Sequence, residues 1–367
     1  MEKCSEALSG LEWPAADLEH LGRCPACDGI CRILLHSSLR DYAFGVATGD
    51  WTMWRCEECR VAYLDPRPTE ASIGRAYSDY YTHQPFKPSY HVSQFNERTL
   101  KTRLRLGYYN ARYGYNFANG WSIGNAVFSI MRKKKALADH MIRHLPAPSV
   151  PRAPLLDVGC GNGAFLLLAQ SLGFDPVGLE PDNNAAANAR AGGLEVRSGI
   201  LPDSRLPANY FEHVTLNHVF EHLHRPRQAA NEILRILKPG GRVWFSQPNA
   251  EAAGLKAFGK YWRGLEVPRH LSLYGVTNFA NILRNAGIEQ IELLPPLPDA
   301  DFYFRQSLAI REKNELGVEA GLPGWDAGII PLGWNSSWRK RARDANNSAH
   351  RVPLTAESFT MIAFKPL

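Results

Sequence analysis

A glycine-rich turn between an apolar strand and an apolar helix most constrains the fold. Residues 155–163 read Leu-Leu-Asp-Val-Gly-Cys-Gly-Asn-Gly, and a helical-looking apolar stretch follows at 164–169. Glycines at every second position let backbone N–H groups approach a ligand where a Cβ would clash. This order of strand, turn and helix is typical of ligand-binding turns in α/β folds. A tight turn without a ligand is the simpler alternative.

Strand and helix patterns alternate after this turn, which indicates a parallel sheet with crossover helices. Helices are expected at 163–172, 183–190, 228–237 and 278–286. Strands are expected at 155–158, 176–180, 194–197, 213–216, 242–246, 288–294 and 358–365. The sequence therefore predicts an α/β core built on these strands.

The chain of 367 residues is too long for one compact domain of usual size. A proline-rich run at 146–154 is typical of a linker. We therefore expect a leader and cysteine module (1–65), a helical lid or substrate segment (66–150), the α/β core (151–296), an insertion of unknown fold (297–357) and a last core strand (358–367).

Two C-x-x-C pairs lie near the N-terminus. Their members are Cys24, Cys27, Cys56 and Cys59. Two such turns can place four thiolates around one tetrahedral ion, which suits a structural Zn²⁺. A redox role is disfavoured because neither pair leads into a βαβ pattern. We expect a zinc ribbon, with Cys31 and Cys160 outside the metal site.

The glycine turn, with its G-x-G-x-G spacing and the preceding Asp157, resembles motif I of the class I S-adenosylmethionine (SAM)-dependent methyltransferases. The cysteine module, the stretch 61–69 and the tyrosines that follow it resemble the front end of a bacterial subgroup with an N-terminal zinc ribbon, which is methyltransferase-23-like. The likeness covers roughly 23–83 and 155–293. It implies a Rossmann-like seven-strand methyltransferase sheet with an antiparallel last strand, and a zinc ribbon and helical lid over the carboxyl ends of the strands.

The resemblance also implies the residues that hold the cofactor SAM. Those in the turn are Asp157, Gly159, Gly161 and Gly163. Glu180 ends the second strand, where a carboxylate accepts hydrogen bonds from ribose hydroxyls. Ile200 stands where the family usually has an acid for the adenine, so that contact falls to backbone N–H groups or to Asp203. Asn217 ends the fourth strand, beside the reacting methyl group.

Histidines mark the reacting end of the predicted site. His218, Glu221 and His222 follow the fourth strand and resemble the motif IV region of the family. On a helix these three would share one face and could share a metal ion. The simpler alternative is that Glu221 caps the segment and His222 bonds a neighbouring loop. His270, in a segment resembling W-x-G-x-x-x-P-R-H-L, is our first candidate for the general base, and His218 is the second.

Charge and composition limit the partners. Residues 66–150 carry thirteen Lys or Arg against four Asp or Glu, which suits an anionic partner or is a solvated face. No apolar run approaches the length of a membrane span, and the N-terminus lacks the apolar core of a signal peptide, so we expect a cytoplasmic protein.

We expect methyl transfer to a small hydroxylated, anionic acceptor. A nucleotide-linked sugar or glycan is favoured, with oxygen ahead of carbon as the methylated atom. The alternatives are a phenolic or polyketide-type natural product, and a non-catalytic zinc-ribbon protein that binds nucleic acid. Nucleic acid is disfavoured as a partner because the ribbon lacks interleaved basic and aromatic residues.

Overall fold

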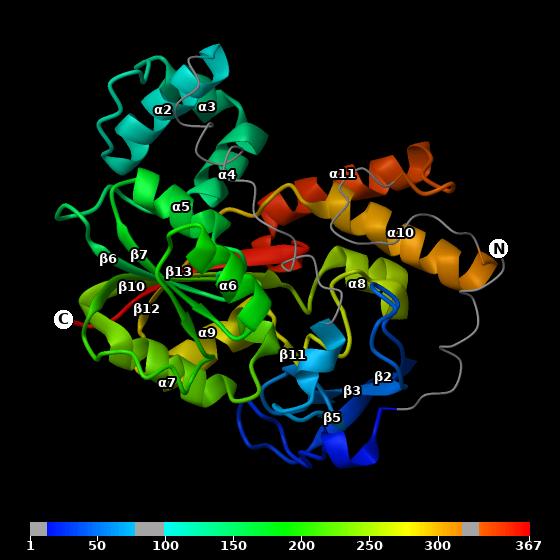
Figure 1. Ribbon diagram of the computed structural model, residues 1–367. Coiled ribbons are helices and arrows are strands. Elements are labelled where there is room, and N and C mark those ends of the chain that lie inside the picture. Colours follow the sequence, from blue (N-terminus) through cyan, green and yellow to red (C-terminus); the bar gives the residue numbers. More distant parts are fainter. Residues whose placement is uncertain (1–12, 78–98, 318–329) are drawn as a thin grey trace, which may run out of the picture.

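A seven-stranded sheet forms the centre of the protein (Figure 1). The computed structural model describes residues 13–77, 99–317 and 330–367. The strands are β6 (Pro154–Val158), β7 (Asp175–Glu180), β8 (Val196–Ser198), β9 (Phe211–Asn217), β10 (Leu237–Pro248), β12 (Gln290–Leu293) and β13 (Ser358–Phe364). They lie in the order β12-β13-β10-β9-β6-β7-β8, with β13 antiparallel to both neighbours. The predicted α/β sheet with an antiparallel last strand is confirmed.

Helices cover both faces of this sheet because its central strands are apolar on both sides. These helices are α5 (Ala164–Ser171), α6 (Asn183–Ala191), α7 (Pro226–Ile236) and α9 (Val276–Asn285). Side chains of α7 and α9 share one core cluster with β6, β9 and β10. Those of α5 pack in a second cluster with the helices that precede the sheet. The sequence placed the start of β10 at Arg242, but the strand begins at Leu237 and takes the Gly240–Gly241 turn as an irregularity.

The cysteine module forms a second, four-stranded sheet. Its own strands are β2 (Arg32–Leu39), β3 (Trp51–Cys56) and β4 (Ala62–Leu64), beside the two-stranded pair of β1 (Leu18–Glu19) and β5 (Arg67–Pro68). Short 3-10 turns lie at Ala15–Asp17 (η1) and Ile73–Tyr77 (η2). The fourth strand is β11 (Ser272–Leu273), which comes from the core and pairs with β4. The module is therefore joined to the core by shared backbone hydrogen bonds.

Two helical parts complete the molecule. The lobe of α2 (Leu100–Tyr113), α3 (Gly124–Ile130) and α4 (Arg132–Met141) stands above α5 (Figure 1). The part predicted as an insertion contains α10 (Ala300–Leu316), α11 (Ser336–Arg351) and η6 (Pro353–Thr355), and α10 packs on α8 (Ala253–Phe258) and η5 (Gly259–Tyr261). None of the helices within the described ranges combines the length and apolar character that crossing a bilayer requires.

Candidate active site

The glycine turn connects β6 to α5 at the carboxyl edge of the sheet. Gly159, Gly161 and Gly163 have φ values of +66°, +54° and +84°, which side-chain-bearing residues rarely adopt. A Cβ on Gly159 would lie 2.5 Å from Val219 Cγ2, and one on Gly163 would lie 2.3 Å from Leu194 Cδ1. The turn thus packs closely on its neighbours while its backbone remains at the strand edge where α/β folds bind ligands.

Glu180, the last residue of β7, lies against this turn. Its carboxylate accepts hydrogen bonds from the backbone N–H of Gly161 at 2.8 Å and of Asp182 at 3.0 Å. Burial raises the pKa of Glu180, and these two donors oppose that rise. A carboxylate has more acceptor sites than these two bonds use, so the group can still accept from a diol.

Asp157 forms a buried ion pair that the sequence did not reveal. The Arg143 guanidinium, which follows α4, donates to Asp157 Oδ1 and, at 2.7 Å, to Thr215 Oγ1. It also lies 3.5 Å from the centre of the Phe165 ring. Burial raises the pKa of Asp157 and lowers that of Arg143, while their pairing opposes both shifts. Arg143 was missed because it lies in the segment before the predicted core.

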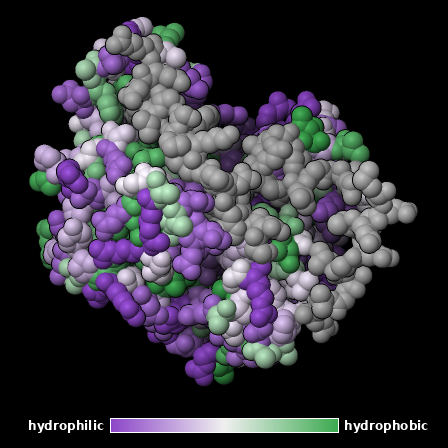
Figure 2. All heavy atoms as spheres, viewed as in Figure 1, coloured by the Kyte–Doolittle hydropathy of each residue, from purple (hydrophilic) through white to green (hydrophobic). Residues whose placement is uncertain are grey.

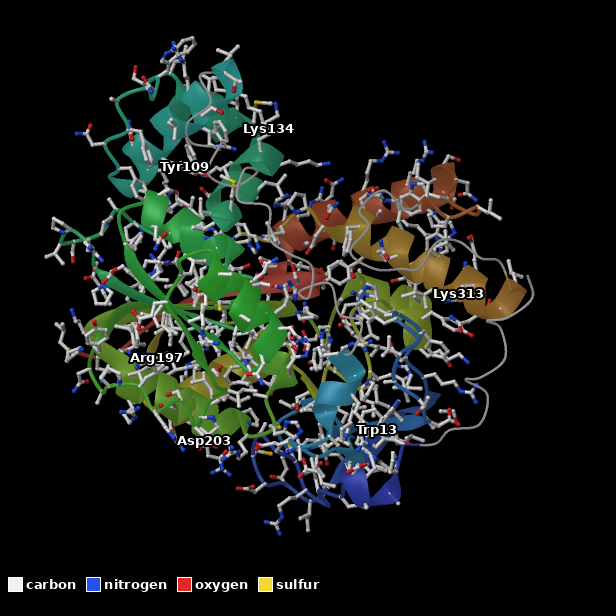
Figure 3. The ribbon with its side chains drawn as sticks, in the orientation of Figure 1. Trp13, Tyr109, Lys134, Arg197, Asp203 and Lys313 are labelled. Carbon is white, nitrogen blue, oxygen red and sulfur yellow. The ribbon has the colours of Figure 1, made fainter. Side chains whose placement is uncertain are left out.

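Two buried oxygen atoms near the turn have no hydrogen-bond partner among the described residues. They are Asp157 Oδ2 and Asn217 Oδ1. Because Val158 pairs with Leu216 in the parallel ladder, Gly159, which follows β6, and Asn217, which ends β9, lie at adjacent strand ends. Unsatisfied buried acceptors are costly, so a donor from a ligand would stabilise this edge. Asp203 is different: its exposed carboxylate pairs with Arg225 (Asp203 is labelled in Figure 3).

The acidic and imidazole groups of the reacting end converge from two distant segments. Glu221 and His222 belong to the short turn η4 (Phe220–His222), and His270 precedes β11. One ligand atom of each lies within 4.8 Å of the others. His218 Nδ1 lies 3.4 Å from Glu221 Oε1. The alternative in which His218, Glu221 and His222 share one helix face does not hold, since η4 is a single 3-10 turn that leaves out His218 and it is His270 that joins Glu221 and His222.

Glu221 is fully buried, yet neither of its carboxylate oxygens has a hydrogen-bond partner among the described residues. Burial alone would raise the pKa of Glu221, but the nearby imidazoles outweigh it and hold that pKa below its usual range. The simpler expectation that Glu221 caps the segment is not met. The other half of that expectation is met, because His222 Nδ1 lies 2.9 Å from the Arg269 carbonyl oxygen.

The surroundings of His270 define its protonation state. His270 Nδ1 lies 2.8 Å from the Gly264 carbonyl oxygen, so Nδ1 carries the proton of the neutral ring and Nε2 is left as an acceptor. This Nε2 lies 3.9 Å from Glu221 Oε1 and 3.8 Å from Glu266 Oε2. Burial lowers the pKa of His270 to about 4, against the opposing attraction of the two carboxylates. An unprotonated Nε2 facing two carboxylates favours the arrival of a proton or a cation there.

Arg269 fixes the segment that carries His270. Its fully buried guanidinium donates to both carboxylate oxygens of Asp41, at 2.5 and 3.0 Å, and to Glu266 Oε1 at 3.2 Å. It also donates to the Ala76 carbonyl oxygen at 2.8 Å. Asp41 belongs to the cysteine module, so this ion-pair network joins that module to the histidine segment.

A small, partly open pocket lies beside the histidines. Its lining residues are His218, His222, Pro248, Arg263, Gly264, Glu266, His270, Phe302 and Tyr303. Phe302 and Tyr303 come from α10, in the part whose fold the sequence left open. No sequence signal marks this aromatic wall, because its partners are distant along the chain. Tyr77 reaches the same place through a 2.9 Å contact between its hydroxyl and His222 Nδ1, whereas Tyr80 and Tyr81 lie outside the described residues.

The four cysteines of the two C-x-x-C pairs converge in space. Their sulfur atoms all lie within 4.8 Å of one another, with 3.5 Å between Cys24 Sγ and Cys59 Sγ and between Cys27 Sγ and Cys56 Sγ. Burial raises the pKa of Cys27 to about 12. Four thiols this close fit a tetrahedral cation, which would stabilise their thiolate forms. Cys31 is exposed and Cys160 is buried in the glycine turn, outside this cluster.

Comparisons with known proteins agree with this geometry. A family model described as "Methyltransferase domain" matches residues 130–293. An uncharacterized methyltransferase of Mycobacterium ulcerans is 33% identical over 123 residues, which are 30% of this chain and 47% of that protein. A ubiquinone biosynthesis O-methyltransferase of Salmonella arizonae is 32% identical over 106 residues, which are 26% of this chain and 42% of that protein.

Similar solved structures include phosphoethanolamine N-methyltransferase 2 of Haemonchus contortus in complex with SAM. It has a TM-score of 0.44 and 17% identity, over 87% of this chain and 64% of that one. The chain spans 38–47% of the length of the first curated relatives that it matches. Residues 130–293 thus match a methyltransferase domain, and the glycine turn, Glu180 and the seven-strand order lie within or around this matched stretch.

Proposed function

We propose that this protein transfers the methyl group of SAM to a hydroxyl group of a small acceptor bound in the histidine-lined pocket. The observation that carries the proposal is the orientation of His270. Its Nδ1–H is held by the Gly264 carbonyl oxygen, and its free Nε2 faces two buried carboxylates beside the pocket. A general base needs an unprotonated nitrogen within reach of the acceptor, and this geometry provides one.

The residues at the glycine turn fit the cofactor. The turn backbone and Glu180 would hold the ribose of SAM. Asp157 Oδ2 and Asn217 Oδ1 would accept hydrogen bonds from the amino-acid part of SAM, since both oxygens are buried without partners among the described residues. Arg143 would neutralise Asp157 and face the carboxylate end. When bound, SAM supplies an electrophilic methyl group, and the protein contributes mainly positioning and exclusion of water.

His270 would take the hydroxyl proton as the methyl group is transferred. Glu221 and Glu266 would stabilise the imidazolium so formed, because both carboxylates lie within 4 Å of Nε2. His218, beside Glu221, is the second candidate for the base.

The pocket wall supports a small ring-shaped acceptor. Phe302 and Tyr303 offer aromatic faces, and Arg263 lies in the same lining. Aromatic faces pack against sugar or planar rings. We favour a nucleotide-linked sugar or glycan, methylated on oxygen, with a phenolic or polyketide-type metabolite as the alternative. A zinc-ribbon protein that binds nucleic acid without catalysis is disfavoured, because the glycine turn and Glu180 fit a bound SAM.

A second arrangement of the same site is a divalent cation held by Glu221, His222 and His270. The specific observation that favours it is the buried Glu221 carboxylate, which has no hydrogen-bond donor among the described residues although three imidazoles surround it. Two nitrogens and one oxygen suit a Zn²⁺-like ion that would acidify the acceptor hydroxyl. In this arrangement His270 is a ligand and the base is His218.

We also propose that Cys24, Cys27, Cys56 and Cys59 hold a structural Zn²⁺. The support is the convergence of their four sulfur atoms. Elemental analysis separates the two metal proposals: about one zinc per chain is expected from the cysteines alone, and a second equivalent lost in His222→Ala would establish the cation at the histidines.

The test of the function is a screen of sugar nucleotides, glycans and phenols for a mass gain of one CH₂ group. His270→Ala should lower turnover by about a hundredfold or more, while calorimetry finds SAM affinity unchanged. His224→Ala is the control, since that imidazole bonds the Pro68 carbonyl oxygen away from the pocket. Because the pKa of His270 is lowered to about 4, activity should persist down to about that pH. A protein that does not bind SAM would refute the proposed function. A loss of turnover below threefold in His270→Ala would refute the assignment of His270 as the general base.

A further inference from the structure

The α2–α4 lobe carries an exposed patch that methyl transfer does not use. We call the lobe patch the residues Trp121, Ile123, Ile130, Lys133, Lys134 and Leu137. Residues 99–150, all described, contain nine Lys or Arg and a single acid, Asp139. Asp139 is buried and accepts from the Tyr108 hydroxyl at 2.5 Å. The surface of this lobe is therefore basic, with no exposed carboxylate from its own residues.

The apolar members of the lobe patch are unusually exposed. Ile130 is 83% exposed, Ile123 59%, Leu137 56% and Trp121 41%. Ile123 and Ile130 are seven residues apart at the two ends of α3, so they share one face of that helix. Single exposed apolar residues are ordinary, but a group of them beside a basic run indicates an interaction surface.

The basic members lie in the first turn of α4, which begins two residues after Ile130. Four cations, Arg132 to Lys135, occupy the first turn of this helix. Cations are unfavourable at a helix N-terminus because the macrodipole is positive there. Helix stability therefore does not account for the run. Lys133 and Leu137 are four residues apart on one face, so charge and apolar surface lie together.

The lobe is placed so that it can reach a large surface. In Figure 1 α2 and α3 stand away from the central sheet, beyond α5. Lys134 is labelled on this lobe in Figure 3. Figure 2 shows hydrophilic and hydrophobic side chains next to each other on the part of the lobe that grey atoms leave visible.

We propose that the lobe patch docks on the surface of an anionic lipid bilayer. Lys133 and Lys134 match the negative headgroups, while Ile123 and Ile130 enter the boundary of the acyl region and Trp121 suits the interface. The lysines of the lobe patch thus favour a negatively charged partner, and its exposed aliphatic side chains favour a partner with an apolar interior. Single-stranded nucleic acid fits less well, because its bases stack on aromatic faces and Trp121 is the one aromatic member of the lobe patch, whose other apolar members are aliphatic.

Vesicle sedimentation of the full chain tests this surface. Binding is expected to vesicles of phosphatidylcholine mixed with phosphatidylglycerol, to weaken as salt increases, and to be absent with phosphatidylcholine alone. Each lysine near an anionic surface contributes about fivefold to partitioning, so Lys133→Gln with Lys134→Gln should lower it by about 25-fold. Ile130→Asp should lower it by roughly tenfold or more, since it places a charge in the apolar contact.

Matched controls keep these variants interpretable. Leu332 is 81% exposed, so Leu332→Asp repeats the Ile130→Asp change elsewhere and should leave vesicle binding intact. Arg339→Gln with Arg343→Gln removes two charges from α11, which lies outside the lobe. Unchanged thermal unfolding of each variant shows that the fold persists. The proposal is overturned if the protein does not bind anionic vesicles, or if Ile130→Asp and Leu332→Asp change vesicle binding equally. It is also overturned if a single-stranded RNA displaces the protein from the vesicles and binds the Ile130→Asp variant with undiminished affinity.

Discussion

Replacing Arg269 by methionine should destabilise the protein strongly, because this side chain is fully buried in an ion-pair network. The change removes two charge-assisted bonds to Asp41 and one each to Glu266 and the Ala76 carbonyl oxygen. Methionine fills most of the volume, so the loss is electrostatic. Breaking a fully buried ion pair by removing one partner costs about 3–5 kcal/mol of unfolding free energy.

In this variant, the remaining hydrogen bonds of Asp41 and Glu266 place the expected loss of unfolding free energy near the lower end of that range. Asp41 keeps hydrogen bonds from the backbone N–H of Phe44, Val46 and Ala47, each at 3.1 Å. Glu266 keeps the Arg263 guanidinium at 2.5 Å. We therefore expect about 3 kcal/mol for Arg269→Met and about 1–2 kcal/mol for Arg269→Lys, which retains the charge but loses the bidentate fork.

Urea unfolding followed by tryptophan fluorescence measures these values. The control is Arg152→Met, whose exposed pair with Asp175 should contribute nothing measurable. In a double-mutant cycle, Arg269→Met and Asp41→Asn should couple by about 2 kcal/mol. Additive effects, or a cost below about 1 kcal/mol for Arg269→Met, would refute the reasoning that this network joins the two parts.

Local geometry supports three further predictions. Gly159→Ala should lower SAM affinity at least tenfold in calorimetry, because its Cβ would lie 2.5 Å from Val219 Cγ2. The control is Gly193→Ala, a glycine with φ of +80° and open space around it, which should leave SAM affinity unchanged. Equal SAM affinities of the two variants would contradict this prediction. Cys56→Ser should lose bound zinc and lower the melting temperature, and a metal-free chain of undiminished stability would remove the zinc proposal. Burial raises the pKa of Asp299 to about 7, so the folded carboxyl holds a proton that the unfolded chain releases above the ordinary pKa of 3.8. Stability should therefore fall as pH rises through that window, and Asp299→Asn should flatten the fall; an unchanged slope would refute it.

The central sheet could be predicted because its signals are local. A strand such as Leu155–Val158 is recognised by its own apolar run, and the glycine turn by residues that need positive φ. Glu180 could be placed because it ends the strand next to that turn. The start of β10 was missed because an irregular strand carries the turn residues that usually end an element.

The sequence by itself determined the α/β core, its glycine turn and the pairing of the two C-x-x-C motifs. The strands, the helices, the glycine turn and each C-x-x-C motif depend on residues a few positions apart, and the two C-x-x-C motifs could be paired because each supplies half of a four-sulfur site. Only the tertiary structure decided that His270 meets Glu221 and His222, that β11 completes the sheet of the cysteine module, and that α10 supplies the aromatic wall. Those contacts join segments far apart in the chain, and their stability comes from burying surfaces and charges that no local pattern specifies.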